Sequence, residues 1–506
     1  MNAVAGVHLE KIARGGTASL AGAGVSAVAN FAVVVVITQS YSKADAGVLF
    51  SVSSLFLIVL AVVGLGMDTG LGRFLLRHVV DERWDWARSC LRNTALVTVI
   101  TGSLGTIGLW VSASPLARML GLPVEQGTAV IRVFAAAVLL SAVGNWALGA
   151  SRAFANIRQT VMIDKLARSL LQLLLVSVCA WLALSVTALS AAWVIPSVLM
   201  APVAVWGLAR VVRRKLPKAT GRVAVPEANR EFWRFTTPRS IAQVAQLVVQ
   251  RLDIILIGAM ISPAAAAVYT AATRFVPLGQ LGAQAISQVV QPRFTHLLAT
   301  NQKEALGEVF RTTTAWNIAI AWPLYLVVGS MAPLYLRLFG PGFAADGFAV
   351  VLVMVVGMLI GVASGPVDTI LLMAGRSWLS LSNALVALVV SVVGCLVLIP
   401  ILGIVGAAVA WCASVVAKSV LGYVQVRRHV GLSALSRASA IAALASLVAF
   451  GVLGAVLSIA GAANVLSLVL LLALGGAAYV WMMWRWRSEL RLESLRSLLP
   501  RKVVGP

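Results

Sequence analysis

Charged side chains are rare in the apolar stretches of this chain, but VVQRLDIILIG, from Val248 to Gly258, contains two of them. An arginine at the centre of a membrane-length apolar segment costs about 2.5–3.5 kcal/mol or more if it faces lipid. Arg251 and Asp253 are two residues apart, about 200° around a helix, and are therefore poorly placed to pair with each other. We expect Arg251 to face an interior cavity.

A second arginine, Arg274, lies in the next apolar segment. At 1.5 Å per residue, both arginines are about 15 Å from the expected helix start, close to the membrane midplane. Asp253 is then placed to pair with Arg274. Two interpretations stay open. The three residues form a net positive site for an anionic substrate, with Asp253 as an ion-pair or proton-coupling residue, or they form a structural ion network that fixes packing.

Amide side chains accompany these charges at helical spacing. On the first helix the spacing places Gln243, Gln246, Gln250 and Asp253 on one face, and on the second it aligns Gln280, Gln284, Gln288 and Gln291. Asn30 occupies the position that corresponds to Gln250 in an internal repeat described below. Because amides both donate and accept hydrogen bonds, this lining suits sugar hydroxyls. Hydrogen bonds between helices are the alternative.

The composition requires a membrane protein. Of the 506 residues, 60% are hydrophobic and only 11% are charged, and the mean hydropathy is +0.95. Apolar runs of about 20 residues recur along the chain, each long enough to cross the bilayer as a helix. We therefore predict an all-α, polytopic membrane fold. The N-terminal segment is predicted to be retained as an anchor rather than cleaved as a signal peptide.

Fourteen spans are predicted. They are Thr17–Gln39, Asp45–Gly66, Asn93–Val111, Thr128–Ala150, Ser169–Val186, Leu189–Leu208, Ser240–Met260, Ala264–Val290, Thr313–Ala332, Gly347–Met373, Leu379–Ile401, Ile404–Val424, Ala438–Ile459 and Asn464–Met483. Most of the 40 Lys and Arg residues fall in one set of loops. The positive-inside rule then places both termini in the cytoplasm, with the basic tail along the inner leaflet.

The chain resembles itself at a shift of about 220 residues. GRFLLRH from Gly72 aligns with PRFTHLL from Pro292, and SPLARMLG aligns with APLYLRLFG. Arg92 aligns with Arg311. These matches predict two six-helix parallel repeats that enclose a central cavity. The predicted organisation is an N-lobe at 1–209, a basic linker at 210–239, a C-lobe at 240–437, two extra helices at 438–483 and a basic tail at 484–506.

The remaining charged and special residues suggest no enzyme. The sequence contains no phosphate-binding loop with a lysine, no metal-ligand spacing and no nucleic-acid module, despite a net charge of +23. Arg132, Asp368 and Lys418 lie near predicted interfaces and are expected to reach lipid headgroups. Pro366 is a candidate hinge. We expect no cofactor, no metal and no catalytic residues.

The two halves, the N-terminal stretch ARGGTASLAGAGVSAVANF and the segment GLGMDTGLGRFLLRH resemble the bacterial polysaccharide and oligosaccharide flippases. These proteins belong to the multidrug, oligosaccharidyl-lipid and polysaccharide exporter superfamily. The resemblance implies alternating-access movement of polyprenyl-diphosphate-linked sugars across the bacterial cytoplasmic membrane. The arginines, which favour an anionic substrate, support this interpretation.

The resemblance leaves other functions open, namely a cation-coupled multidrug antiporter, a lipid II flippase for peptidoglycan and, more remotely, a membrane scaffold for glycan-synthesis enzymes. The expected partners are a lipid-linked glycan, membrane lipids and polysaccharide polymerase or export machinery. The energy source is a proton gradient, a sodium gradient or the membrane potential.

Overall fold

A computed structural model describes the chain except residues 1, 155–156, 217–225, 435, 460–462 and 492–506, and it describes side chains from residue 21 onward with a few further gaps. Every regular element in the described part is helical, most of them α-helices and three of them short π-helical segments. The predicted all-α fold is thus confirmed. The chain forms two compact units, Arg14–Ala267, called here the N-terminal unit, and Met1–Ala13 with Val268–Pro506, called the C-terminal unit.

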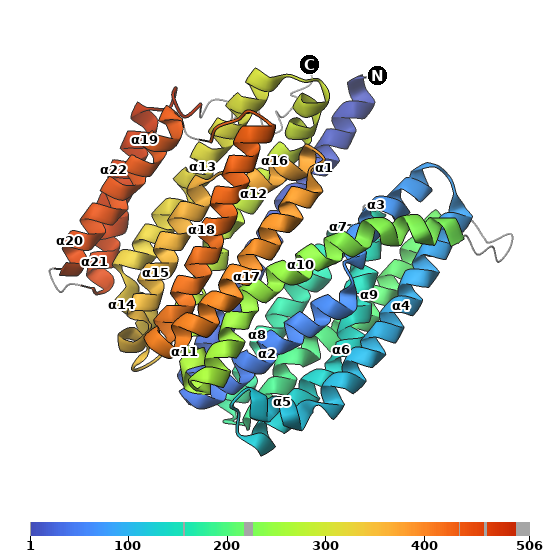
Figure 1. Cartoon of the computed structure of the whole chain (residues 1–506), viewed down its shortest axis with the longest axis horizontal. Coiled ribbons are helices and arrows are strands. Elements are labelled where there is room, and N and C mark those ends of the chain that lie inside the picture. Colours follow the sequence, from blue (N-terminus) through green and yellow to red (C-terminus); the bar gives the residue numbers. More distant parts are fainter. Residues whose placement is uncertain (1, 155–156, 217–225, 435, 460–462, 492–506) are drawn as a thin grey trace. The chain divides into compact units, whose positions relative to one another are not determined.

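The N-terminal unit contains most of α1 and the elements up to the start of α11. Their bounds are α1 Asn2–Ser40, α2 Lys43–Gly64, α3 Met67–Val80, α4 Trp84–Val111, α5 Ala113–Met119, α6 Val124–Ala153, α7 Ile157–Thr160, η1 Val161–Ala167, α8 Arg168–Trp181, α9 Val186–Lys215 and α10 Pro226–Met260. Figure 1 shows α10 running beside α2, with which it is in extensive contact.

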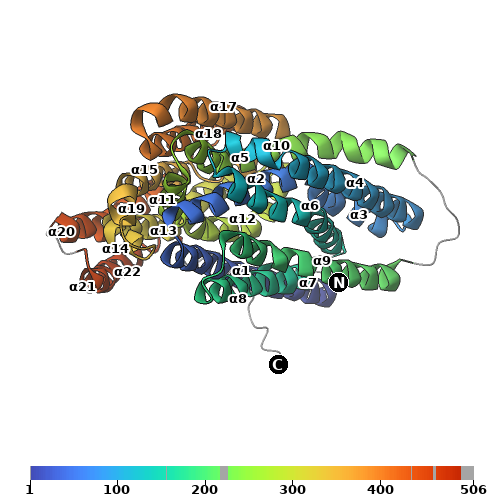
Figure 2. The same cartoon turned by 90° about the horizontal axis from the view of Figure 1, so that it is seen from below.

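The C-terminal unit contains the remaining helices. Their bounds are α11 Pro263–Thr273, α12 Val276–Ala299, α13 Lys303–Ser330, α14 Ala332–Arg337, α15 Phe343–Ala363, α16 Val367–Met373, α17 Ser377–Leu402, α18 Ile404–His429, α19 Arg437–Ser446, η2 Leu447–Val452, α20 Leu453–Ile459, α21 Val465–Leu470, η3 Leu471–Gly475 and α22 Gly476–Arg485. Helices α17 and α18 pair along their lengths, as Figures 1 and 2 both show.

Eleven helices in the described part are long and apolar enough to cross a membrane. The other three predicted spans also coincide with helices, namely α8, the pair α11 and α12, and α13. These helices are shorter, interrupted or more polar. The chain is therefore a multi-pass membrane protein, and the count of fourteen spans stays a prediction.

The predicted repeat is visible in the order of the elements. The elements from α2 to α9 have counterparts from α11 to α18, most of which begin about 220 residues later, although the lengths of some counterparts differ. Both α4 and α13, for example, are 28-residue helices followed by a short one. The compact units do not divide the chain at the linker 210–239, because α10 packs with α2 and α3. The lobe boundaries stay a prediction.

Helix α3 was not predicted as a separate element. Helix α2, which precedes it, is capped at its start by Ser42, whose side chain accepts a hydrogen bond from the backbone N–H of Asp45. At the other end the chain turns through Leu65 and Gly66, both with positive φ, and continues as α3. A Cβ at Gly66 would lie 2.9 Å from Cα of Ser240 on α10, so only glycine allows this close approach.

The predicted spans at the C-terminus form a helical hairpin beyond the repeat. The first arm of this hairpin, α19 through α20, packs against α13, and α22 in the second arm packs against α19. Both views in Figures 1 and 2 show this red pair beside α13. The tail then folds back. Leu490 is 1% exposed, and its carbonyl accepts a hydrogen bond of 3.0 Å from the Trp316 indole of α13. Residues 486–491 therefore contact protein, whereas 492–506 lie outside the described part.

Candidate functional site

The two charges of the Val248–Gly258 segment lie in the second half of α10. Asp253 is buried, at 4% exposure, and its Oδ1 accepts a hydrogen bond of 2.8 Å from the backbone N–H of Ile254. Arg251 is partly buried, and its Nε is shielded from solvent and has no hydrogen-bond acceptor among the described residues. A buried guanidinium N–H without an acceptor is costly. The arginine therefore has donor capacity for a ligand.

The second arginine lies in the other unit. Arg274 is at the junction of α11 and α12, where its backbone N–H donates to the carbonyl of Ala271. Tyr335 is close enough for an electrostatic interaction with it, and the Tyr335 hydroxyl donates to the same carbonyl at 2.8 Å. The pairing of Asp253 with Arg274 stays a prediction because the two residues belong to different units.

The predicted amide lining is largely exposed. Gln243, Gln246 and Gln250 on α10 are exposed, as are Asn30 on α1 and Gln284 on α12. Gln243 Nε2 donates to Thr69 Oγ1 at 2.8 Å, and Asn30 Nδ2 donates to the carbonyl of Ser26 at 2.7 Å. The Gln288 side chain lies outside the described part. The contact of these exposed amides with water and with substrate stays a prediction.

The helix around Pro366 is interrupted. Helix α15 ends at Ala363 and α16 begins at Val367, with Pro366 as its N-cap residue. Movement at this break stays a prediction. Directly after it, Asp368 pairs with Lys418 of α18 and accepts a hydrogen bond of 3.3 Å from Ser380. Each residue is therefore the other's counter-ion, and contact of either with lipid headgroups stays a prediction.

The N-terminal unit contains a pocket of about 270 Å³ that sequence reasoning missed. It lies between the α2–α3 turn, α6, η1 and α10. The polar residues that line it are Asp68, Thr98, Asn145, Trp146, Arg152, Asp164 and Gln243. Of these, only Gln243 had been identified. Two of the helices that border the pocket pack closely: a Cβ at Gly149 of α6 would lie 3.2 Å from Cα and Cβ of Asp68 on α3. The glycine therefore lets α3 approach α6.

Ion pairs organise one wall of this pocket. Arg168 Nη2 lies 2.9 Å from Asp164 Oδ1, and Lys165 Nζ lies 3.2 Å from Oδ2. Burial raises the pKa of Asp164, but Arg168 and Lys165 outweigh that effect and hold it below its usual value. Asp164 is thus a fixed anion. Arg152 Nη2 is 3.8 Å from Asp68 Oδ2, a loose pair, and also interacts electrostatically with Asp164.

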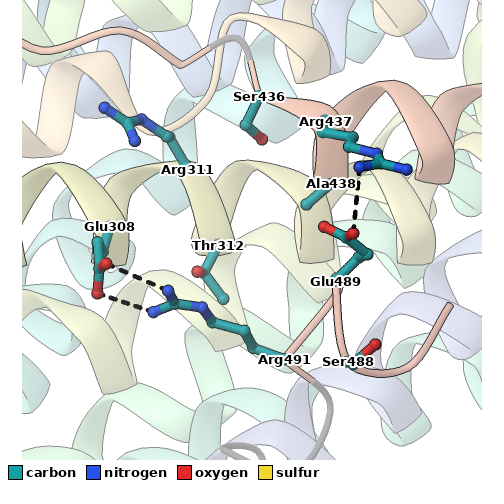
Figure 3. A pocket seen from close by; sticks show the side chains of 9 residues that line it. All are labelled: Glu308, Arg311, Thr312, Ser436, Arg437, Ala438, Ser488, Glu489 and Arg491. Atoms are coloured by element: carbon teal, nitrogen blue, oxygen red, sulfur yellow. Dashed lines mark hydrogen bonds and ion pairs between the residues drawn. The ribbon is translucent and has the colours of Figure 1, made fainter.

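A second pocket, of about 420 Å³, lies in the C-terminal unit where the tail meets α13 and α19. Figure 3 shows Arg491 reaching Glu308 with two parallel contacts of 2.8 and 3.1 Å, while Arg437 pairs with Glu489 at 3.5 Å. Arg311 points away from the Glu308–Arg491 pair. Hydrogen bonds from Arg491 lower the pKa of Glu308. Two of the three arginines are thus neutralised by carboxylates, and both of these pairs join the tail or the residues before it to other helices.

The missed residues gave only local signals in the sequence. Asp68, Asn145 and Arg152 stand near the ends of apolar runs, where polar residues are common. Their convergence depends on the α2–α3 turn and on the π-helical segment η1, which lacks a recognisable sequence pattern. Asp68 and Gly149 are about 80 residues apart in the chain, and hydropathy does not predict a contact between them.

The comparison with known families resolves the broad identity of the chain. The sequence pattern of a family described as polysaccharide biosynthesis protein matches residues 42–340, more than half of the chain. The chain belongs to this polysaccharide biosynthesis family. The resemblance stated from the sequence is thereby confirmed. Among curated proteins, none matches the sequence.

Solved structures with the same fold are transporters. The lipid II flippase MurJ in an inward-closed conformation has a TM-score of 0.70 at 10% identity, and the alignment covers 92% of this chain and 97% of the MurJ chain. An inward-facing multidrug resistance MATE family transporter of the MOP superfamily has a TM-score of 0.64 at 16% identity, covering 80% and 94%. A MOP superfamily transporter from Pyrococcus furiosus, reported with a reversed binding-pocket polarity, scores 0.61 at 18% identity, covering 84% and 96%. This polysaccharide biosynthesis protein thus has the MOP transporter fold.

Proposed function

We propose that this protein is a flippase that moves a polyprenyl-diphosphate-linked oligosaccharide, or a related anionic glycolipid, across the membrane by alternating access. The family supplies the link to polysaccharides, and a fold similar to that of the lipid II flippase MurJ supplies the link to lipid-linked cargo. We further propose that the membrane is the bacterial cytoplasmic membrane and that both termini are cytoplasmic, as the basic loops indicate.

The observation that carries the substrate class is Arg251. Its Nε is buried in a helix long and apolar enough to span the membrane, and it has no hydrogen-bond acceptor in the part of the chain that the structure describes. Asp253, two residues away, supplies one negative charge near Arg251. A diphosphate would add further negative charge and several acceptor oxygens. The exposed amides of α10 would contact sugar hydroxyls, while the polyprenyl chain remains in lipid.

Glycan export in cells tests this proposal. A strain that lacks the gene is complemented with wild type, Arg251→Lys or Arg251→Ala, and surface polysaccharide and lipid-linked precursor are quantified. Loss of a charge-assisted contact of about 1.5–3 kcal/mol predicts a drop in export of about tenfold or more for Arg251→Ala, with precursor accumulating inside. Arg251→Lys should retain part of the activity because it keeps the charge but loses the planar fork.

The matched control is Arg132→Ala. This arginine also lies in a membrane helix, but it is exposed and rests near the Trp110 ring at 5.7 Å. Export should remain at the wild-type level in this control. Normal export by an abundant Arg251→Ala variant would remove the main support for an anionic substrate. Lethality on depletion of the protein would instead indicate peptidoglycan lipid II as the cargo.

A further inference from the structure

We infer that the 270 Å³ pocket of the N-terminal unit is a binding site for one neutral sugar ring. The inference rests on the proposed function, because it assigns a place to the glycan part of the cargo. The pocket lies between the start of α3, the second half of α6 and α10. Its volume is just below the roughly 300 Å³ lower limit of pockets for drug-sized ligands. It therefore suits a single small, polar ligand unit.

Trp146 provides an apolar surface in this pocket. Its indole Nε1–H donates to Thr94 Oγ1 of α4 at 3.0 Å, so the polar end of the side chain is satisfied inside the protein and the ring orientation is fixed. The ring itself is partly exposed and lines the pocket. The electron-rich face of an aromatic ring attracts the weakly positive C–H groups that a sugar presents on one side.

Hydrogen-bonding groups stand beside the ring. Asn145, the adjacent residue on α6, is exposed and forms no hydrogen bond with the described part of the chain, so its amide offers both donors and acceptors. Asp68 accepts a long hydrogen bond of 3.4 Å from Thr69 Oγ1 and lies 3.8 Å from Arg152, so its carboxylate keeps further acceptor sites for a hydroxyl. Gln243 uses Nε2 to bind Thr69, which leaves its amide oxygen available.

The charges of the pocket favour a neutral ligand over an ion. Arg152 lies between two carboxylates, Asp68 and Asp164, and is therefore a poor site for a phosphate. Asp164 is in turn occupied by Arg168 and Lys165, which disfavours a bound cation. Balanced charges, an aromatic ring and convergent donors and acceptors together match the chemistry of a hydroxyl-rich ring.

Direct binding tests the inference independently of transport. The purified full chain in lipid nanodiscs is titrated with glucose, galactose and N-acetylglucosamine, and separately with inorganic pyrophosphate, using calorimetry. We expect saturable binding of at least one sugar with a roughly millimolar Kd. Asn145→Ala and Trp146→Leu should each weaken it about tenfold or more, whereas Trp146→Phe, which keeps an aromatic ring, should bind within about threefold of wild type.

Trp206→Leu is the matched control, because Trp206 is a 62%-exposed tryptophan of the same unit, on α9, outside the pocket. Its sugar affinity should be unchanged. Variants are compared only where the thermal unfolding midpoint stays within a few degrees of wild type. Asn145→Ala meets that condition most readily, because Asn145 is exposed and forms no hydrogen bond with the described residues. Binding of no sugar, undiminished binding by Asn145→Ala and Trp146→Leu, or displacement of sugar by pyrophosphate would each overturn the inference.

The outcomes separate this inference from the proposed function. Sugar binding that depends on Asn145 and Trp146, combined with normal glycan export in Arg251→Ala, would retain the pocket and remove the anionic-cargo proposal. Export that requires Arg251, combined with undiminished sugar binding in the pocket variants, would retain the flippase and remove the pocket.

Discussion

At the scale of single residues, the charges of this protein fall into paired and available groups. Asp368, Lys418 and Asp164 have fixed partners. Arg251 interacts electrostatically with Asp253, but its Nε–H has no acceptor within the described part of the chain. Residue types and spacing in the sequence were enough to identify Arg251 as unusual. They were not enough to identify which charges are paired, because the partners of Asp368 and Asp68 come from other helices. The Asp68, Asn145 and Trp146 cluster was missed for the same reason.

Asp164 should stabilise the N-terminal unit through its two ion pairs. Its pKa is lowered, so the stabilisation is present at pH values above the unfolded-state pKa of about 3.9 and is lost as pH falls through the lower folded-state pKa. At pH 7, Asp164→Asn should cost about 1–2 kcal/mol, because it weakens charge-assisted contacts to Arg168 and Lys165. The measurement is thermal unfolding in detergent at pH 7 and pH 4.

The control for this prediction is Asp81→Asn. Asp81 lies 3.7 Å from Arg77 in an exposed pair, which contributes about 0–0.5 kcal/mol. The destabilisation caused by Asp164→Asn should exceed that of the control at pH 7 and should still be present at pH 4. Equal effects of the two variants at pH 7 would show that Asp164 has no special stabilising role.

At the scale of elements, hydropathy predicted the helices well and their interruptions poorly. The spans, the C-terminal helical pair and the 220-residue repeat all follow from patterns that recur over 20 residues or more. The separate helix α3, the π-helical segment η1 and the docking of residues 486–491 do not. Each depends on a local backbone feature or a distant contact, such as the positive φ of Leu65 and Gly66 or the Trp316–Leu490 hydrogen bond.

The docked tail offers a comparison of apolar and ionic contacts. Leu490 is 1% exposed against α13, whereas the Arg491 and Glu308 side chains are each 52% exposed. Leu490→Ala should therefore cost about 2–3 kcal/mol of local docking, and Glu308→Gln no more than about 1 kcal/mol. Hydrogen exchange of residues 484–491 measures both. Faster exchange in Glu308→Gln than in Leu490→Ala would contradict this ranking.

At the scale of the whole molecule, a basic, apolar chain of 506 residues is a multi-pass membrane protein of the polysaccharide biosynthesis family with a MOP transporter fold. Composition was sufficient to predict a multi-pass, all-α membrane protein, because it is a property of the entire chain, whereas the family was predicted from the resemblance of particular segments. The glycan and the coupling ion depend on a few side chains, so composition cannot supply them. The central claim is that the chain itself moves an anionic lipid-linked glycan.

Reconstituted transport tests that claim most directly. The purified chain is placed in liposomes with a fluorescent polyprenyl-diphosphate-linked oligosaccharide, and a membrane-impermeant quencher reports its movement between leaflets. Wild type and Arg132→Ala should flip the lipid at similar rates, and Arg251→Ala should be slower by about tenfold or more. Absence of flipping by wild type under imposed proton, sodium or voltage gradients, or equal rates in wild type and Arg251→Ala, would contradict the account.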